Sequence, residues 1–157
     1  MTTRTVSLTV NGRAVQADVD DRTLLVHLLG ELGIDVRVGC DTSNCGACLV
    51  TIDGEVVKSC TTFAVQCRGQ VVETTSGLAG RLNDHPVLAW WADAPAHVDA
   101  PCRSGAVHIV LELLAREREL TADDVRSAME GLICWCGQCD SIVSVVAALA
   151  RESEGTR

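Results

Sequence analysis

The chain has 157 residues, of which 47% are hydrophobic, 22% are charged and three are proline, so it can bury one respectable core or two small ones. Thirteen basic and twenty-one acidic side chains give a formal charge of −8, which argues against a nucleic-acid surface and favours protein partners or small ligands. No apolar run approaches the roughly 20 residues that span a bilayer, and the N-terminus does not resemble a signal peptide, so we expect a cytoplasmic protein.

A β-hairpin is predicted at the start of the chain. Apolar and polar residues alternate over residues 6–10, which is the pattern of a half-buried strand. Asn11-Gly12 is a strong signal for a two-residue turn, and residues 14–19 can return as the second strand.

A helix is predicted next, because leucines recur at helical spacing over residues 24–32. Thr23 or Asp21 is expected to cap its N-terminus. Gly33 is expected to end it, since glycine is common just past the last turn of a helix.

Four cysteines then follow with the spacing C-x4-C-x2-C and a fourth after eleven further residues: Cys40, Cys45, Cys48 and Cys60. This is the plant-type ferredoxin spacing, in which four thiolates hold two irons. Structural zinc sites usually show two CxxC knuckles, and only one is present here. Disulfides are less attractive in a reducing compartment. The spacing therefore predicts a 2Fe-2S cluster and one-electron transfer.

The loop that carries three of these cysteines is rich in small residues. Gly39, Asn44 and Gly46 are expected to line the cluster, because the backbone must wrap it closely and glycine permits conformations that side chains forbid. Backbone N–H donors and the exclusion of water help to set the reduction potential of such a cluster.

Further strands are predicted after this loop. Residues 49–52 and 55–57 flank Asp53-Gly54, which is a second hairpin signal, and residues 70–75 can supply one more strand. Strands and one helix around a cysteine loop predict a ferredoxin-like domain over residues 1–77.

The second half of the chain has a helical pattern. We expect four helices: one capped by Asp84 with Pro86 in its first turn, one with an apolar stripe over residues 106–114, one opened by Thr121-x-x-Asp124, and one with its inner face over residues 142–149. Residues 76–81 are expected to be the connection. The sequence thus predicts an α+β protein with a small helix bundle over residues 78–157.

The helical half has its own cysteines near helix starts: Cys102, Cys134, Cys136 and Cys139. Helix N-terminal amides stabilise thiolates and an anionic cluster, so a second iron-sulfur site is expected here. The alternative is that these are buried apolar residues, and Cys67, which has no nearby cysteine partner, is expected to be one. His27 and His108, within apolar helical stretches, are expected to be ordinary packed or surface residues.

Three segments carry a resemblance to a known family: Gly39-Cys-Asp-Thr-Ser-Asn-Cys-Gly-Ala-Cys48, Lys58-Ser59-Cys60-Thr61 and Phe63-Ala64-Val65-Gln66. Over nearly all of its length the chain resembles the small iron-sulfur subunit of the molybdenum hydroxylases. That family includes xanthine oxidase, aldehyde oxidase and aerobic carbon monoxide dehydrogenase, and the segments are especially similar to the carbon monoxide dehydrogenase branch.

The resemblance implies a β-grasp plant-type ferredoxin domain followed by a four-helix bundle, each with one 2Fe-2S cluster. It implies an electron relay from a molybdopterin-binding large subunit to an FAD-binding medium subunit, in a hetero-oligomer such as a dimer of heterotrimers. The ligands that it implies are Cys40, Cys45, Cys48 and Cys60 for the FAD-side cluster, and Cys102, Cys134 and Cys136 for most of the molybdenum-side cluster.

The second site departs from the family pattern. The family reads Q-C-G-x-C-T-P-G where this chain has residues 98–105, so Asp99 replaces the first cysteine, and Cys139 stands where the family has tyrosine. The fourth ligand could be Cys139, Asp99, His97 or water, or the second cluster could be absent or of a different type. Trp135 stands where the family has arginine, so we hypothesise that the molybdenum-side half of the pathway is altered.

Two other functions remain open: a free-standing ferredoxin-like carrier, and a redox or iron sensor whose second cluster is labile. No paired carboxylates, Ser/His/Asp set or phosphate loop is found in the sequence, so we expect no substrate site on this chain alone.

Overall fold

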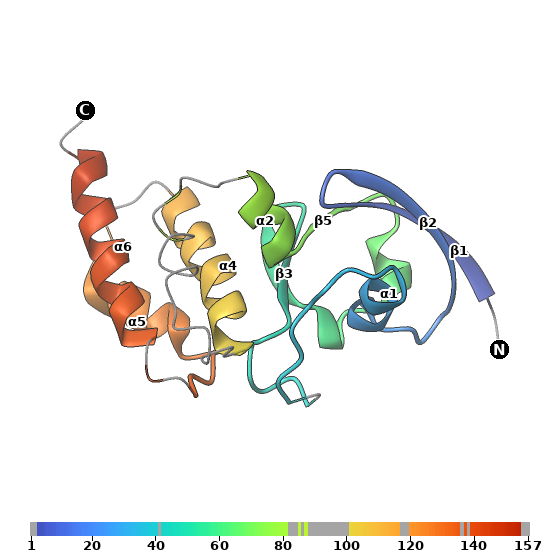
Figure 1. Cartoon of the computed structure of the whole chain (residues 1–157), viewed down its shortest axis with the longest axis horizontal. Coiled ribbons are helices and arrows are strands. Elements are labelled where there is room, and N and C mark those ends of the chain that lie inside the picture. Colours follow the sequence, from blue (N-terminus) through green and yellow to red (C-terminus); the bar gives the residue numbers. More distant parts are fainter. Residues whose placement is uncertain are drawn as a thin grey trace.

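The structure is a computed structural model that describes residues 3–40, 42–81, 85, 87, 101–116, 120–135, 137 and 139–154. The strands lie at one end of the molecule and the later helices at the other, so the first strand and the last helix are far apart (Figure 1). This is the α+β architecture that the sequence predicts. None of the helices in these ranges is long and apolar enough to cross a membrane.

One mixed sheet holds the N-terminal half together. Its strands are β1 (Thr3–Val10), β2 (Arg13–Asp20), β3 (Leu49–Ile52), β4 (Glu55–Lys58) and β5 (Val71–Glu73), in the order β2-β1-β5-β3-β4. β1 runs parallel to β5, and the other neighbours are antiparallel. Asn11-Gly12 and Asp53-Gly54 have positive φ at both residues, as two-residue hairpin turns require. Both predicted turns and all five predicted strands are confirmed.

Helix α1 (Leu25–Glu31) packs its leucines into the core of this half. Gly33 has φ +71° and follows the last turn, as predicted. The predicted cap is wrong: the N-cap residue is Leu24, and no side chain caps the helix. Backbone hydrogen bonds to a distant segment hold this end instead, since Leu25 N–H donates to Thr62 and Ala64 N–H donates to the carbonyl of Thr23.

Two short 3₁₀ helices, η1 (Ser59–Thr61) and η2 (Ala64–Cys67), connect β4 to β5. Cys67 at the end of η2 is fully buried in the same core, and burial raises the pKa of its thiol. The prediction that Cys67 is a core residue is confirmed.

The C-terminal half contains α2 (Thr75–Arg81), α4 (Pro101–Ala115), α5 (Ala122–Met129) and α6 (Cys139–Glu154). The last three are the predicted helices. At α5, Thr121 and Asp124 form the predicted capping box: Asp124 N–H donates to Thr121 Oγ1, and Thr121 N–H donates to the Asp124 carboxylate. The helix predicted after Asp84, with Pro86 in its first turn, lies outside the described residues apart from His85 and helical Val87.

Residues 76–81, predicted to be a connection, belong to helix α2. Leu78 explains the difference, because it is buried in the core that α4, α5 and α6 share. The segment therefore packs as part of the helical half. The boundary between residues 77 and 78 stays a prediction.

His108 joins the two halves. It lies on α4 with 1% of its surface exposed, and its Nδ1 is 2.9 Å from Thr51 Oγ1 on β3. Its Nε2 is 3.2 Å from Thr75 Oγ1 at the start of α2. Burial lowers the pKa of His108 to about 4, so the ring is neutral near pH 7 and has one donor and one acceptor nitrogen. His108 is packed and His27 is exposed, as predicted for histidines that are not ligands.

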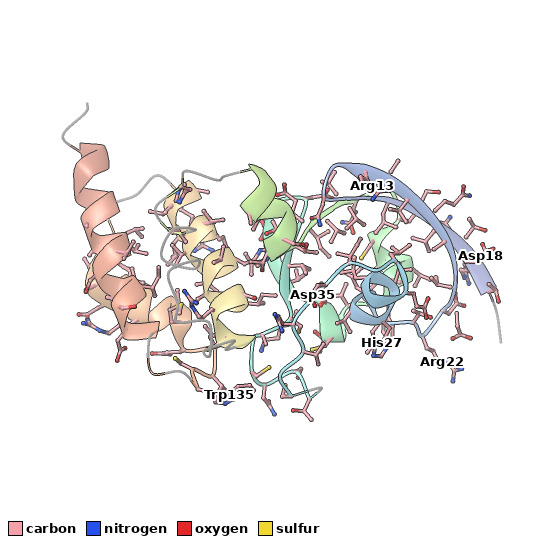
Figure 2. The ribbon with its side chains drawn as sticks, viewed as in Figure 1. Arg13, Asp18, Arg22, His27, Asp35 and Trp135 are labelled. Atoms are coloured by element: carbon pink, nitrogen blue, oxygen red, sulfur yellow. The ribbon has the colours of Figure 1, made fainter. Side chains whose placement is uncertain are left out.

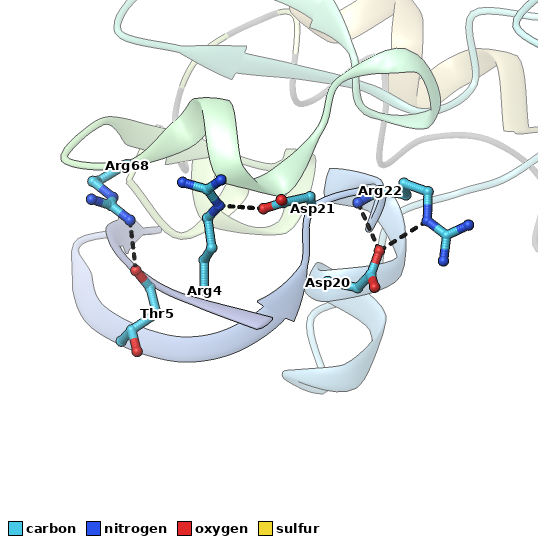
Figure 3. Close-up of polar contacts among 6 residues, drawn as sticks. All are labelled: Arg4, Thr5, Asp20, Asp21, Arg22 and Arg68. Atoms are coloured by element: carbon cyan, nitrogen blue, oxygen red, sulfur yellow. Dashed lines mark hydrogen bonds and ion pairs between the residues drawn. The ribbon is translucent and has the colours of Figure 1, made fainter. Parts of the chain in front are cut away.

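The outer end of the β1–β2 hairpin has polar contacts that are exposed to solvent (Figure 3). Arg4 pairs with Asp21, Arg22 donates to the Asp20 carboxylate through its backbone and its guanidinium, and Arg68 donates to the carbonyl of Thr5. The hydrogen bonds from Arg22 lower the pKa of Asp20. Exposed pairs of this kind contribute little because solvent screens the charges, so the end of the sheet is held mainly by strand pairing.

Candidate metal centre

The hairpin β3–β4 brings Cys60 back beside the cysteine loop. Cys48 directly precedes β3 and Cys60 lies in η1 just after β4, while Leu49 and Lys58 are paired across the two strands. Ser59 is fully buried and donates to the carbonyl of Cys48 from its N–H at 3.1 Å and its Oγ at 2.8 Å. The turn at residues 53–54 therefore places a cysteine twelve residues away next to the loop.

Backbone N–H groups point at the sulfurs of this loop. The Sγ of Cys40 accepts from the N–H of Thr42 at 3.4 Å and of Cys45 at 3.3 Å. The Sγ of Cys45 accepts from the N–H of Ala47 at 3.4 Å. Such donors stabilise negative charge on sulfur. Hydrogen bonds from Thr42 and then Cys45 lower the pKa of Cys40 to about 6.

The four thiols form two neighbouring pairs. Cys40 lies beside Cys45, whose pKa is raised by burial and then by its neighbour Cys40. Cys60 lies beside Cys48, and burial together with that neighbour raises the pKa of Cys60 to about 11. Two neighbouring thiols are hard to ionise together because their negative charges repel. They become thiolates when a metal ion replaces their protons.

The donor set is four cysteine sulfurs, and a 2Fe-2S cluster is held by four thiolates distributed over two irons, so these residues fit such a cluster. Within the residues that the structure describes, no group of three or more Cys, His, Asp or Glu side chains is arranged around a single point. Cys40, Cys45, Cys48, Cys60 and Cys67 are free thiols, so none of these five is used for a disulfide.

The small residues of the loop have distinct roles. Gly46 has φ +73°, and a Cβ there would lie 2.9 Å from the carbonyl oxygen of Gly131. Gly39 has no such φ, but a Cβ there would meet the ring of Trp135 and the Sγ of Cys45. Asn44 is exposed, and its amide donates to Thr42 Oγ1 at 3.3 Å. Asn44 therefore braces the loop from outside.

Lys58 supports the loop in a way that spacing did not indicate. Its Nζ donates to the carbonyl of Ser43 at 2.7 Å, and Ser43 has φ +62°, which is uncommon for a residue other than glycine. The sequence signal for Lys58 is the segment Lys58-Ser59-Cys60, which is one of the segments that carry the family resemblance.

The second set of predicted ligands is described in part. Cys102 lies in the first turn of α4 and is buried, and Cys134 is half-buried before α6; both border the core of the helical half. Cys139 is the first residue of α6, but its side chain lies outside the described residues, as do Cys136, Asp99 and His97. The choice of a fourth ligand stays a prediction.

Residues 131–135, which precede α6, lie across the first cysteine loop. Ile133 N–H donates to the carbonyl of Cys45 at 2.9 Å. A Cβ on Gly105 of α4 would clash with the carbonyl oxygen of Gly46, so helix and loop are in close contact there. Trp135 is found on the side of the molecule where this loop enters β3 (Figure 2). The two cysteine sets thus lie on segments that touch.

The chain is similar in sequence to known iron-sulfur proteins. The 2Fe-2S iron-sulfur cluster binding domain family matches residues 8–79. The chain is 44% identical over 165 residues to the caffeine dehydrogenase subunit gamma of Pseudomonas sp. (strain CBB1), covering 98% of this chain and 95% of the relative. It is 32% identical over 165 residues to the aldehyde oxidoreductase iron-sulfur-binding subunit PaoA of Escherichia coli (strain K12), covering 94% of this chain and 72% of the relative.

A solved structure has the same fold along almost the whole chain. The crystal structure of quinoline 2-oxidoreductase from Pseudomonas putida 86 includes a chain that matches with a TM-score of 0.77 and 27% identity, over 96% of this chain and 97% of that one. The likeness includes both the strand half and the helical half.

Proposed function

The chain belongs to the family of the iron-sulfur subunits of the molybdenum hydroxylases, and on this premise we propose that it relays electrons from a molybdopterin-binding large subunit to an FAD-binding medium subunit. Two 2Fe-2S clusters would supply the one-electron steps. The substrate would bind to another subunit, because the candidate functional residues of this chain are cysteines that would hold iron.

Cys40, Cys45, Cys48 and Cys60 are the proposed ligands of the first cluster. Their arrangement in two pairs and the N–H groups directed at Cys40 and Cys45 support this assignment. Lys58 holds the loop through Ser43.

Cys102, Cys134 and Cys136 are the proposed ligands of the second cluster, with Cys139 as the first candidate for the fourth position and Asp99 or His97 as the alternatives. The burial of Cys102 in the first turn of a 15-residue helix supports its role, because the N-terminal end of α4 favours negative charge.

The hydrogen bond from Ile133 to Cys45 carries the relay proposal. Ile133 directly precedes Cys134, so covalent bonds and one hydrogen bond of 2.9 Å connect a proposed ligand of the second cluster to a proposed ligand of the first. A carrier that exchanged electrons with one partner at a time would not need this connection. For this reason we favour the subunit over the free-standing carrier and the sensor.

The proposed assembly is a hetero-oligomer with the large and medium subunits, such as a dimer of heterotrimers, in the cytoplasm. The relatives are themselves subunits of larger enzymes, which supports partner chains, and the free thiols of the first cysteine set and of Cys67 suit a reducing compartment. Gel filtration of the chain co-expressed with its neighbouring genes tests this: elution as a lone monomer would favour the carrier.

Low-temperature EPR with spin quantitation on the anaerobically purified, reduced protein tests the two clusters. We expect two distinct signals, each near about one spin per chain. Cys45→Ser should remove the first signal and stop reduction of FAD in the complex, whereas Cys67→Ala, which changes a buried thiol outside the proposed sites, should keep both signals. A single signal in the parent chain would contradict the two-cluster relay.

The same measurement identifies the fourth ligand. Cys139→Ser, Asp99→Ala and His97→Ala change one candidate each, and we expect Cys139→Ser to alter or abolish the second signal while the other two variants retain it. Loss of the second signal in Asp99→Ala would instead indicate an oxygen ligand, and its loss in His97→Ala would indicate a nitrogen ligand.

A further inference from the structure

Trp135 packs against the first cysteine loop although it belongs to the segment of the second cysteine set. A Cβ built on Gly39 would lie 2.8 Å from Cη2 and 3.1 Å from Cζ3 of Trp135, and 3.0 Å from the Sγ of Cys45. The edge of the six-membered ring and the sulfur of a proposed ligand therefore meet at the same glycine. Any side chain at position 39 would separate them.

The backbone around Trp135 fixes this contact. Ile133 donates its N–H to the carbonyl of Cys45, and Gly131 and Leu132 lie against Gly46. The segment that precedes Trp135 is therefore anchored to the cysteine loop at Cys45 and Gly46. Figure 2 shows Trp135 on the same side of the molecule as this loop and far from His27 on α1.

Core packing does not explain a tryptophan at this position. Trp135 is 53% exposed, the largest value among the exposed large hydrophobic residues of the described chain. A ring that served only to fill the core would be buried, because burying apolar area is what stabilises the fold. The ring lies instead against the backbone at Gly39, beside the Sγ of Cys45.

Covering this side of the loop has an electrostatic consequence. A 2Fe-2S cluster with four thiolates gains one negative charge on reduction, and water stabilises the more highly charged form. An apolar ring that keeps water from the loop therefore disfavours the reduced cluster. Cys40, the ligand next to Gly39, is half-exposed, so its surroundings respond to such a cover.

We propose that Trp135 is a positioning residue that shields the first cluster at Gly39 and Cys45 and thereby lowers its reduction potential. A lower potential would increase the driving force for passing the electron on from this cluster. Because Trp135 lies between Cys134 and Cys136, the loop of one cluster would then tune the potential of the other.

The test is an EPR-monitored redox titration of the full chain holding its clusters. Trp135→Phe keeps a ring, Trp135→Leu keeps a smaller apolar side chain, and Trp135→Ala removes the cover. We expect the midpoint potential of the first cluster to become more positive in the order Phe, Leu, Ala, with Trp135→Phe close to the parent chain. Val71→Ala, which shortens an exposed apolar side chain on β5, is the control and should leave the potential unchanged.

A second readout measures the water itself. In D2O, the deuterium modulation of the electron spin echo of the reduced first cluster should deepen in the same order. A series that retains the first signal but shows neither a graded potential nor a graded modulation overturns the proposal, even if thermal stability falls. The proposal rests on the ligands assigned above: a parent chain without a first-cluster signal would overturn both, whereas an ungraded series would overturn this inference alone.

Discussion

At the scale of single residues, the cysteine loop depends on backbone positions that tolerate no larger side chain. Gly46 combines a positive φ with a close approach to Gly131 and Leu132, while Gly12 in the first hairpin has nearly the same φ and open space around it. A comparison of these two glycines separates the cost of backbone strain from the cost of a steric clash, because only Gly46 also contacts a neighbouring segment.

Gly46→Ala should therefore destabilise the protein more than Gly12→Ala. Both variants carry the strain of a left-handed residue, about 1–2 kcal/mol, and Gly46→Ala adds the displacement of the 131–132 backbone, about 1–3 kcal/mol more. Chemical denaturation measures the two free energies of unfolding. Equal losses would mean that the loop and this segment separate at little cost.

At the scale of elements, α5 shows how a local signal positions a functional segment. The capping box of Thr121 and Asp124 starts the helix, and the helix ends just before residues 131–135, which lie on the cysteine loop. Val125 and Met129 bury its apolar side in the helical core. A helix of eight residues has little stability of its own, so its cap matters.

Replacement of the cap is expected to weaken this element. Thr121→Ala removes the acceptor for Asp124 N–H and should cost about 0.5–2 kcal/mol in the free energy of unfolding, whereas Thr121→Ser keeps the hydroxyl and most of the stability. Hydrogen exchange of the α5 amides should rise in the Ala variant. Equal hydrogen-exchange rates of the α5 amides in Thr121→Ala and Thr121→Ser would show that packing alone holds the helix.

At the scale of the whole molecule, His108 is a buried polar link between the strand half and the helical half. Its two ring nitrogens reach threonines on β3 and α2, and Glu73 and Glu112 line the cavity beside it. Burial is the cause of its low pKa. A protonated ring has two donor nitrogens and no acceptor, so protonation would alter this link between the halves.

Acidification should destabilise the protein through His108. Its pKa falls from 6.5 to about 4 on folding, so between these values the unfolded chain binds a proton that the folded chain does not. The contribution of His108 to the free energy of unfolding is fully present above pH 6.5. It decreases by up to about 3 kcal/mol as the pH falls towards 4.

Urea unfolding at pH 7 and pH 5 measures this dependence. His108→Gln should flatten it, while His27→Gln, which changes an exposed histidine, should leave it as it is. An equally steep dependence in the His108→Gln chain would assign the effect to other groups.

The sequence by itself determined the features whose causes are local. The spacing of Cys40, Cys45 and Cys48, the turns at Asn11-Gly12 and Asp53-Gly54, and the cap at Thr121 each depend on neighbours within a few residues. Backbone sterics and short side-chain hydrogen bonds act over that range, so these patterns could be read without a fold.

Only the tertiary structure decided what depends on distant residues. Helix α1 starts after Leu24 because Leu25 N–H donates to the carbonyl of Thr62 and Ala64 N–H donates to the carbonyl of Thr23. Segment α2 is a helix because its Leu78 is buried in the helical core. Ile133 on Cys45 and Trp135 on Gly39 join segments about 90 residues apart along the chain, and neither contact has a periodic or spacing signal. Such contacts arise from the packing of one half on the other, which the order of residues along the chain does not display.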